Sequence, residues 1–114
     1  MVRPGATAGE GAQAGFRCLE ERGFRITVTR QEFERSGEAA LNLTFPSMGH
    51  GLGMWWELPW LTPDDTTVLE PSMVIAIERA VGRTGVGAAS YEDDVLVTPN
   101  GCEVLTTTPK RWWE

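Results

Sequence analysis

The chain contains little of several residue types on which particular functions depend. Ten Lys and Arg residues stand against 16 Asp and Glu, which gives a formal net charge of -6, and no basic stripe is present that could neutralise a phosphate backbone. The only two cysteines, Cys18 and Cys102, have no neighbours at metal-ligand spacing, so we expect reduced thiols in the core. These deficits argue against nucleic acid as a partner and against a cysteine metal site.

Long apolar runs are also missing from the sequence. No stretch reaches the ~18 apolar residues that span a bilayer, and the opening "MVRPGATAGE" has no apolar signal-peptide core. We therefore expect no membrane association and a cytoplasmic location. With 41% hydrophobic and 23% charged residues in 114 positions, the composition is that of a single small globular domain.

Local signals predict one helix and several strands. Thr7 and Glu10 have the spacing of a capping box and Gly23 suits a C-terminal cap, which together predict a helix over residues 7–22. Alternating or β-rich runs predict strands, and "TPNG" predicts a turn from which "CEVL" returns as a hairpin. The predicted strands cover residues 24–30, 41–45, 73–78 and 91–98.

The segments between these elements are predicted to be irregular. Residues 31–40 are polar and fit either a loop or a short helix. Three prolines exclude a long helix over residues 57–72, which we expect to be a loop. The glycine-rich stretch 81–90 is expected to be a surface connection.

One imidazole in a glycine-rich segment, "GHGLGMWW" at residues 49–56, is the first candidate for chemistry. Flanking glycines let the backbone approach a neighbour closely, so His50 could be aimed at a fixed point. Glu78 ends one β-rich run on the face of Val74 and Ala76, where a carboxylate is costly to bury without a cation. If the run that begins near Glu92 pairs with it, a nitrogen and oxygen ligand set results. Such a set suits manganese, cobalt, zinc or iron.

Each of these residues also has a purely structural interpretation. A lone histidine in a glycine loop is more often a surface or hydrogen-bonded residue than a ligand. Glu78 could be an exposed strand-end charge, and the acidic run that starts at Glu92 could simply be solvated. The tryptophans Trp55, Trp56 and Trp60 could wall an apolar pocket or fill the core, and core filling is the more common role.

Three blocks, in order, resemble the pita-bread metallopeptidases, which include methionine aminopeptidase, aminopeptidase P, prolidase and creatinase. The blocks are "GHGLGM", "LEPSMVIAIE" and "YEDDVLVTPNGCEVLT", and the opening "VRPGATAGE" is similar to the start of a family helix. The resemblance runs from about residue 2 to residue 107. It implies that residues 1–114 form a single partial catalytic domain, the C-terminal half of a pita-bread fold. Such a half is an α+β unit with a curved, mostly antiparallel sheet and one or two packed helices.

The same resemblance implies a dinuclear metal-dependent hydrolase of the Xaa-Pro aminopeptidase or prolidase type. Its divalent ligands would be His50, Glu78 and Glu92, with Glu92 bridging and Glu78 also the catalytic proton shuttle. The substrate, a small peptide or amide-like molecule, would lie in a pocket lined by Trp55, Trp56, Glu57 and Trp60.

The sequence also departs from the family pattern. The family's two aspartate ligands, on strands before the helix, have no counterpart, and Pro46 and Glu57 stand where family peptidases carry histidines. We therefore expect an incomplete, weakly active or inactive unit. One alternative is a non-catalytic remnant or interaction module that forms a homodimer or joins a complementing upstream half. Another is a lyase whose tryptophans enclose the cation of a small zwitterionic substrate.

Overall fold

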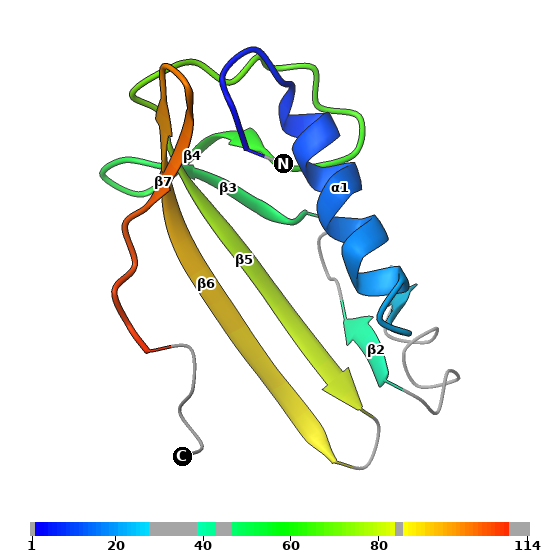
Figure 1. The fold of residues 1–114 in the computed structure, drawn as a ribbon. Coiled ribbons are helices and arrows are strands. Elements are labelled where there is room, and N and C mark those ends of the chain that lie inside the picture. The colour runs from blue at the N-terminus through cyan, green and yellow to red at the C-terminus, as the bar shows by residue number, and fades with distance from the viewer. Residues whose placement is uncertain (1, 28–38, 43–46, 84–85, 110–114) are drawn as a thin grey trace.

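A computed structural model describes residues 2–27, 39–42, 47–83 and 86–109 of the chain, which form one helix and a seven-stranded sheet (Figure 1). Helix α1 spans Ala8–Glu20. It begins there because the Thr7 hydroxyl accepts a hydrogen bond from the Glu10 N–H while the Glu10 carboxylate accepts one from the Thr7 N–H. Gly23 follows with φ +83°. The predicted helix is confirmed to within about two residues at each end.

The sheet is antiparallel except for one pair of strands. Strand β5 is its centre: β2 and β3 share one of its edges, β6 pairs along the other, and β4 and β7 lie outside β3 and β6. Only β1 and β2 run parallel among the described strands. The strands are β1 (Arg25–Thr27), β2 (Ala39–Asn42), β3 (Gly49–Leu52), β4 (Trp56–Trp60), β5 (Val74–Arg83), β6 (Gly87–Thr98) and β7 (Gly101–Val104).

Two segments that were predicted to be loops contain strand residues in the structure. Residues 81–90 were expected to be a surface connection, but β5 and β6 continue into them and pair as far as Arg83 and Gly87. Glycine and alanine weaken a strand without preventing it from pairing, so composition alone misjudged this stretch. The expected loop over 57–72 is wrong at its start, because β4 occupies residues 56–60. Pro59 is tolerated there since β4 is an edge strand.

The other predicted strands are seen only in part. Residues 25–27 of the predicted strand 24–30 form β1, and β2 covers the start of the predicted strand 41–45. Phe24 is described but lies just before β1, and residues 28–30 and 43–45 of the two predictions lie outside the described residues. The stretch 31–40 was open between a loop and a short helix. Its last two residues belong to β2, so they are strand instead, and residues 31–38 lie outside the described residues. The hairpin formed by β6 and β7 is confirmed, with Thr98 paired to Gly101.

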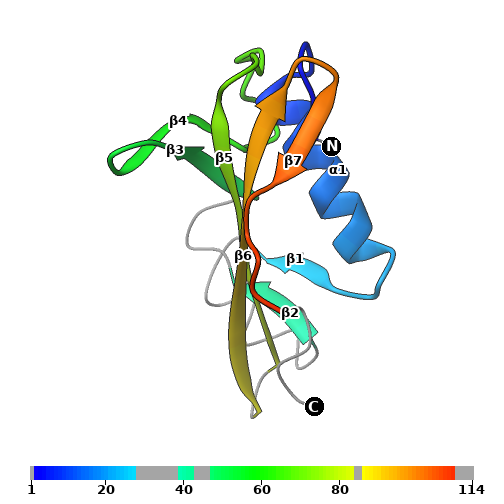
Figure 2. The same ribbon diagram turned by 60° about the vertical axis from the view of Figure 1, so that its left-hand side comes forward.

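The hydrophobic core lies between α1 and one face of the sheet, and Figure 2 shows α1 on that side. The helix contributes Ala8, Ala12 and Phe16, and the sheet contributes side chains such as Ile75 and Val95. Both cysteines are exposed, so the expectation of core thiols is wrong. Cys18 lies outside the buried helix stripe, and Cys102 is on the outer strand β7. No helix in the described part of the chain is long and apolar enough to cross a bilayer.

Candidate metal site

Strand β3 is wedged between β4 and β5, and two glycines make this close approach feasible. A Cβ atom on Gly49 would overlap the carbonyl oxygen of Ala76, and one on Gly51 would overlap that of Leu58. Gly49 also has φ +146°, which side-chain-bearing residues rarely adopt. The wedge places His50 directly opposite Ala76 of β5. The backbone freedom predicted for this segment therefore serves to position the imidazole.

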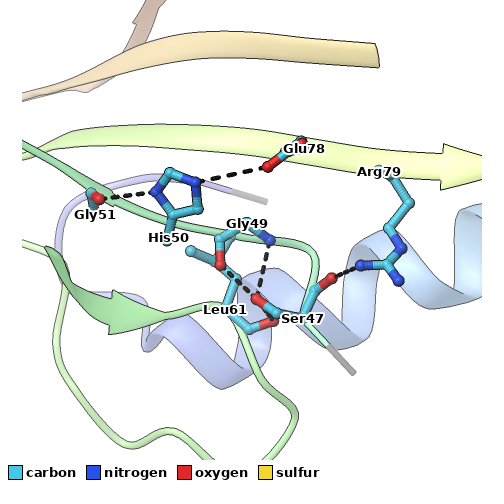
Figure 3. Close-up of polar contacts among 7 residues, drawn as sticks. All are labelled: Ser47, Gly49, His50, Gly51, Leu61, Glu78 and Arg79. Carbon is cyan, nitrogen blue, oxygen red and sulfur yellow. Dashed lines mark hydrogen bonds and ion pairs between the residues drawn. The ribbon is translucent and has the colours of Figure 1, made fainter. Parts of the chain in front are cut away.

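Polar contacts fix the chain immediately before β3 (Figure 3). The Ser47 hydroxyl donates to the Gly49 carbonyl and accepts from the Gly49 N–H. The Arg79 guanidinium donates to the Ser47 carbonyl. Burial lowers the pKa of Arg79 to about 10, and the neighbouring Glu78 opposes that shift. Arg79 remains charged at neutral pH, so this contact holds Ser47 against β5.

The His50 ring is almost completely buried, with 3% of the residue exposed. Its Nδ1 lies 2.9 Å from the Gly51 carbonyl oxygen, which can only accept, so we assign the proton of the neutral ring to Nδ1. Its Nε2 is then a bare acceptor that lies 3.7 Å from Glu78 Oε2 (Figure 3). Nε2 is buried and has no hydrogen-bond partner among the described residues. Ligating histidines adopt this arrangement, with one nitrogen bonded to a carbonyl and the other free.

The two glutamates face each other across neighbouring strands. Glu78 of β5 is the direct partner of Glu92 of β6, and like charges in this position are destabilising. One ligand atom from each glutamate and one from His50 lie within 4.8 Å of one another. Partial desolvation, followed by repulsion from Glu78 and Asp94, raises the pKa of Glu92, while His50 lowers it. The structure thus brings together the three side chains predicted to bind metal.

Two tryptophan rings lie beside the imidazole, and a third lies next to one of them at the surface. The Trp56 and Trp60 rings have centroids 5.4 and 5.6 Å from that of His50, and the Trp55 ring lies 6.2 Å from that of Trp56. Trp55 and Trp56 are 75% and 59% exposed, so the core-filling interpretation is wrong for both. A ring wall beside His50 is the arrangement that the structure shows.

Glu57 is placed differently from its aromatic neighbours. It pairs with Gly51, whereas Trp60 pairs with His50, and the register shifts between these two pairs. Residues that alternate along a strand face opposite sides, so Glu57 lies on the side of the sheet away from the imidazole. Its carboxylate accepts a hydrogen bond from the Met54 N–H at the hairpin tip, over 3.2 Å. Pro46, the other position where the family peptidases carry a histidine, lies outside the described residues.

One acidic residue near the site was not singled out by the sequence. Asp94 belongs to the run that seemed solvated, yet its Oδ1 is buried and has no hydrogen-bond partner among the described residues. The signal that could have found it is the period of two along a strand, which puts Asp94 on the same face as Glu92.

Comparisons with known proteins decide the family. The model of metallopeptidase family M24 matches residues 1–99. The chain belongs to this family. It is 40% identical over 65 residues to the uncharacterized peptidase YqhT of Bacillus subtilis, a match that covers 56% of the chain and 18% of that relative. It is 42% identical over 65 residues to the Xaa-Pro dipeptidase of Pyrococcus furiosus, covering 56% of the chain and 19% of that relative.

Solved structures of this family share the fold. The prolidase from Pyrococcus furiosus superposes with a TM-score of 0.71 and 31% identity, over 96% of this chain and 28% of that one. A methionine aminopeptidase from Thermotoga maritima gives 0.57 and 24% identity, over 95% and 45%, which shows the fold alone. The predicted α+β pita-bread architecture is confirmed. The matched segment spans less than a fifth of these curated relatives.

Proposed function

We propose that the chain is the metal-binding part of a dinuclear metal-dependent hydrolase that acts on small Xaa-Pro peptides. The observation that carries this proposal is the group formed by His50, Glu78 and Glu92, whose ligand atoms lie within 4.8 Å of one another. Family membership supports it, since the matched relatives include an Xaa-Pro dipeptidase.

The donor set fits a divalent cation. A neutral imidazole nitrogen combined with two carboxylates suits manganese, cobalt, zinc or iron, and His50 Nε2 is a buried acceptor without a hydrogen-bond partner in the described structure. The cation would also relieve the repulsion between the facing glutamates. When bound, such a cation supplies Lewis acidity, which lowers the pKa of water and polarises a substrate carbonyl.

The two glutamates differ in what they can do. The Glu78 side chain is 39% exposed and its Oε2 lies 3.7 Å from the imidazole Nε2, so it reaches both solvent and the proposed cation site. We assign the catalytic proton transfer to Glu78. Glu92, opposite it on β6, is proposed as the bridging carboxylate. His50 keeps its Nε2 aimed at this pair through the hydrogen bond from Nδ1.

Trp55, Trp56 and Trp60 are proposed to line the substrate pocket next to the imidazole. Their rings would bind the apolar part of a small peptide. Glu57, the fourth residue predicted for this pocket, holds the hairpin tip that carries Trp55 and Trp56. We therefore propose that Glu57 acts on the pocket by fixing this hairpin.

The aromatic wall also favours a second candidate function. Exposed indole rings beside two carboxylates attract a cation, which would suit a lyase acting on a small zwitterionic substrate such as a sulfonium carboxylate. Parallel assays of an Xaa-Pro dipeptide and a sulfonium zwitterion, with the upstream half of a relative supplied, would separate the two. Turnover of the zwitterion without turnover of the dipeptide would favour the lyase.

The site is proposed to be incomplete in this chain, which would be weakly active or inactive alone. Large apolar side chains are exposed around the β3–β4 hairpin, with Met54 at 97% and Leu58 at 77%. Apolar patches of this kind mark association surfaces, so we propose a homodimer or a complementing upstream half as partner. Sedimentation velocity of the chain alone, and of the chain mixed with the upstream half of a relative, provides the check. A chain that stays monomeric at high concentration and does not bind the upstream half would contradict the proposal. The cytoplasmic location stays a prediction.

Calorimetric titration with Mn²⁺ or Co²⁺ tests the proposed function. The wild-type chain is expected to bind with a Kd well below about 1 mM, and His50→Ala is expected to lose that affinity. Glu20→Gln removes one exposed charge at the end of α1, on the other side of the sheet, and serves as the matched control. A wild type that binds no tighter than about millimolar would contradict the proposal.

A further inference from the structure

Asp94 lies in the same row of the sheet as His50. It is the direct partner of Ala76 on β5, and Ala76 is in turn the partner of His50 on β3. Directly paired residues point to the same face, so Asp94, Ala76 and His50 share the face that carries Glu78 and Glu92. Ala76 is 0% exposed. The small Ala76 side chain therefore lies between the imidazole and the Asp94 carboxylate on this face.

The backbone of Asp94 is fixed by the segment after β7. Its N–H donates to the Thr106 hydroxyl over 2.8 Å, and its carbonyl accepts from the Leu105 N–H over 2.8 Å. Its Oδ1 is nevertheless buried without a hydrogen-bond partner in the described part of the chain. Burying a carboxylate oxygen without a donor is costly, so this oxygen needs an external donor, such as a water held by a cation.

A second buried atom on this face has the same need. His50 is 3% exposed, and its Nε2, 3.7 Å from Glu78 Oε2, also lacks a hydrogen-bond partner among the described residues. Nε2 and the ionised carboxylates are all acceptors, so none of them can satisfy another. One external cation would compensate all of them at once.

We propose that Asp94 is a further residue of the cation site and acts on the bound cation through a bridging water. The inference rests on the proposed function, because it requires a cation beside His50. Asp94 is not among the residues whose ligand atoms lie within 4.8 Å of one another, which is why we assign it an outer position. Its oxygen would accept from a water bound to the cation, and its charge would strengthen the binding.

Mn²⁺ titration of Asp94→Asn, with Asp93→Asn as the matched control, tests this inference. Asp93 carries the same charge one residue away, but it pairs with Ile77 and lies on the helix side of the sheet. Asp94→Asn is expected to weaken Mn²⁺ binding by about 10- to 100-fold. The affinity of Asp93→Asn should stay within about threefold of the wild type.

Thermal unfolding with and without Mn²⁺ distinguishes binding from a structural role. Removing one charge from a repulsive face should leave the metal-free Tm of Asp94→Asn unchanged or raised, while the increase in Tm produced by Mn²⁺ becomes smaller. If Asp94→Asn does not fold, Asp94→Thr, which suits a strand, is expected to show the same loss of affinity.

The outcomes separate the two proposals. A wild type that binds Mn²⁺ and an Asp94 variant that binds equally well would overturn this inference alone. Equal losses in the Asp93 and Asp94 variants would also overturn it, because they would show a general charge effect. A wild type that binds no Mn²⁺ would overturn the proposed function and this inference with it.

Discussion

The two faces of β5 differ in what they contribute to the molecule. On the side of α1, Ile75 is fully buried and Ile77 packs against the same core. On the other side, Glu78 faces Glu92, and Nε2 of the buried His50 has no hydrogen-bond partner among the described residues. The first face gains free energy from burial, whereas the second places like charges together at a cost. The contrast indicates that one face holds the fold together and the other is arranged for a ligand.

The largest effect is expected where β3 is wedged against β5. Gly49→Ala would force a Cβ into the Ala76 carbonyl at φ +146°, so we expect a loss of about 4 kcal/mol or more in the free energy of unfolding. Gly87 has φ +145° but open space around it, and Gly87→Ala should cost only about 1–3 kcal/mol. Urea denaturation of both variants measures the difference. Similar losses in the two variants would show that β3 and β5 are not closely packed at Gly49.

A pair of substitutions on β5 should separate stability from binding. Ile75→Ala is expected to lower the free energy of unfolding by about 2–5 kcal/mol because it opens a cavity beneath α1. Provided that it remains folded, its Mn²⁺ affinity should be unchanged. Glu78→Gln should do the reverse, with a retained Tm and at least about tenfold weaker binding. Denaturation combined with calorimetry tests both, and parallel losses in the two variants would contradict a division of roles.

Acidification should reveal the cost of the facing glutamates. The folded-state pKa of Glu92 is raised, so ionisation of this carboxyl disfavours the folded state. The protonated carboxyl therefore favours folding at low pH, and this contribution to stability is lost as pH rises through the folded-state pKa. Metal-free Glu92→Gln should therefore melt at a higher temperature than the wild type at pH 7. The difference in Tm between the two proteins should disappear at about pH 4, where the wild-type carboxyl is protonated. A Glu92→Gln variant that melts lower at pH 7 would contradict this sign.

The smallest effect on stability is expected for the aromatic wall. Trp56 is 59% exposed, so Trp56→Ala should change the free energy of unfolding by no more than about 0.5 kcal/mol. Its Mn²⁺ affinity should also be preserved, because the indole supplies no ligand. Urea denaturation and calorimetry check the two expectations. A loss of several kcal/mol would show that this tryptophan contributes to the hydrophobic core.

Features set by neighbouring residues could be predicted from the sequence. The capping box of Thr7 and Glu10 and the turn before Gly101 depend on contacts a few residues apart, and both are present as expected. The family blocks indicated which side chains would meet. The direct pairing of Glu78 with Glu92 follows from the way β5 and β6 form one antiparallel ladder.

Features that depend on distant partners could not be predicted in the same way. Pro59 argues against strand unless the strand is known to lie at an edge. The exposure of Trp55 depends on how the β3–β4 hairpin projects, and the face on which Glu57 lies depends on how β4 pairs with β3. The hydrogen bond from the Asp94 N–H to Thr106 likewise depends on the chain after β7. Each of these is decided by sheet order and register, which local patterns do not encode.

Mn²⁺ titration of the wild type beside His50→Ala tests the central claim most directly. If the imidazole and the facing glutamates form one cation site, the wild type should bind Mn²⁺ with a Kd well below about 1 mM, and His50→Ala should bind at least about tenfold more weakly. Equal binding by both proteins, or binding by neither, would contradict the claim.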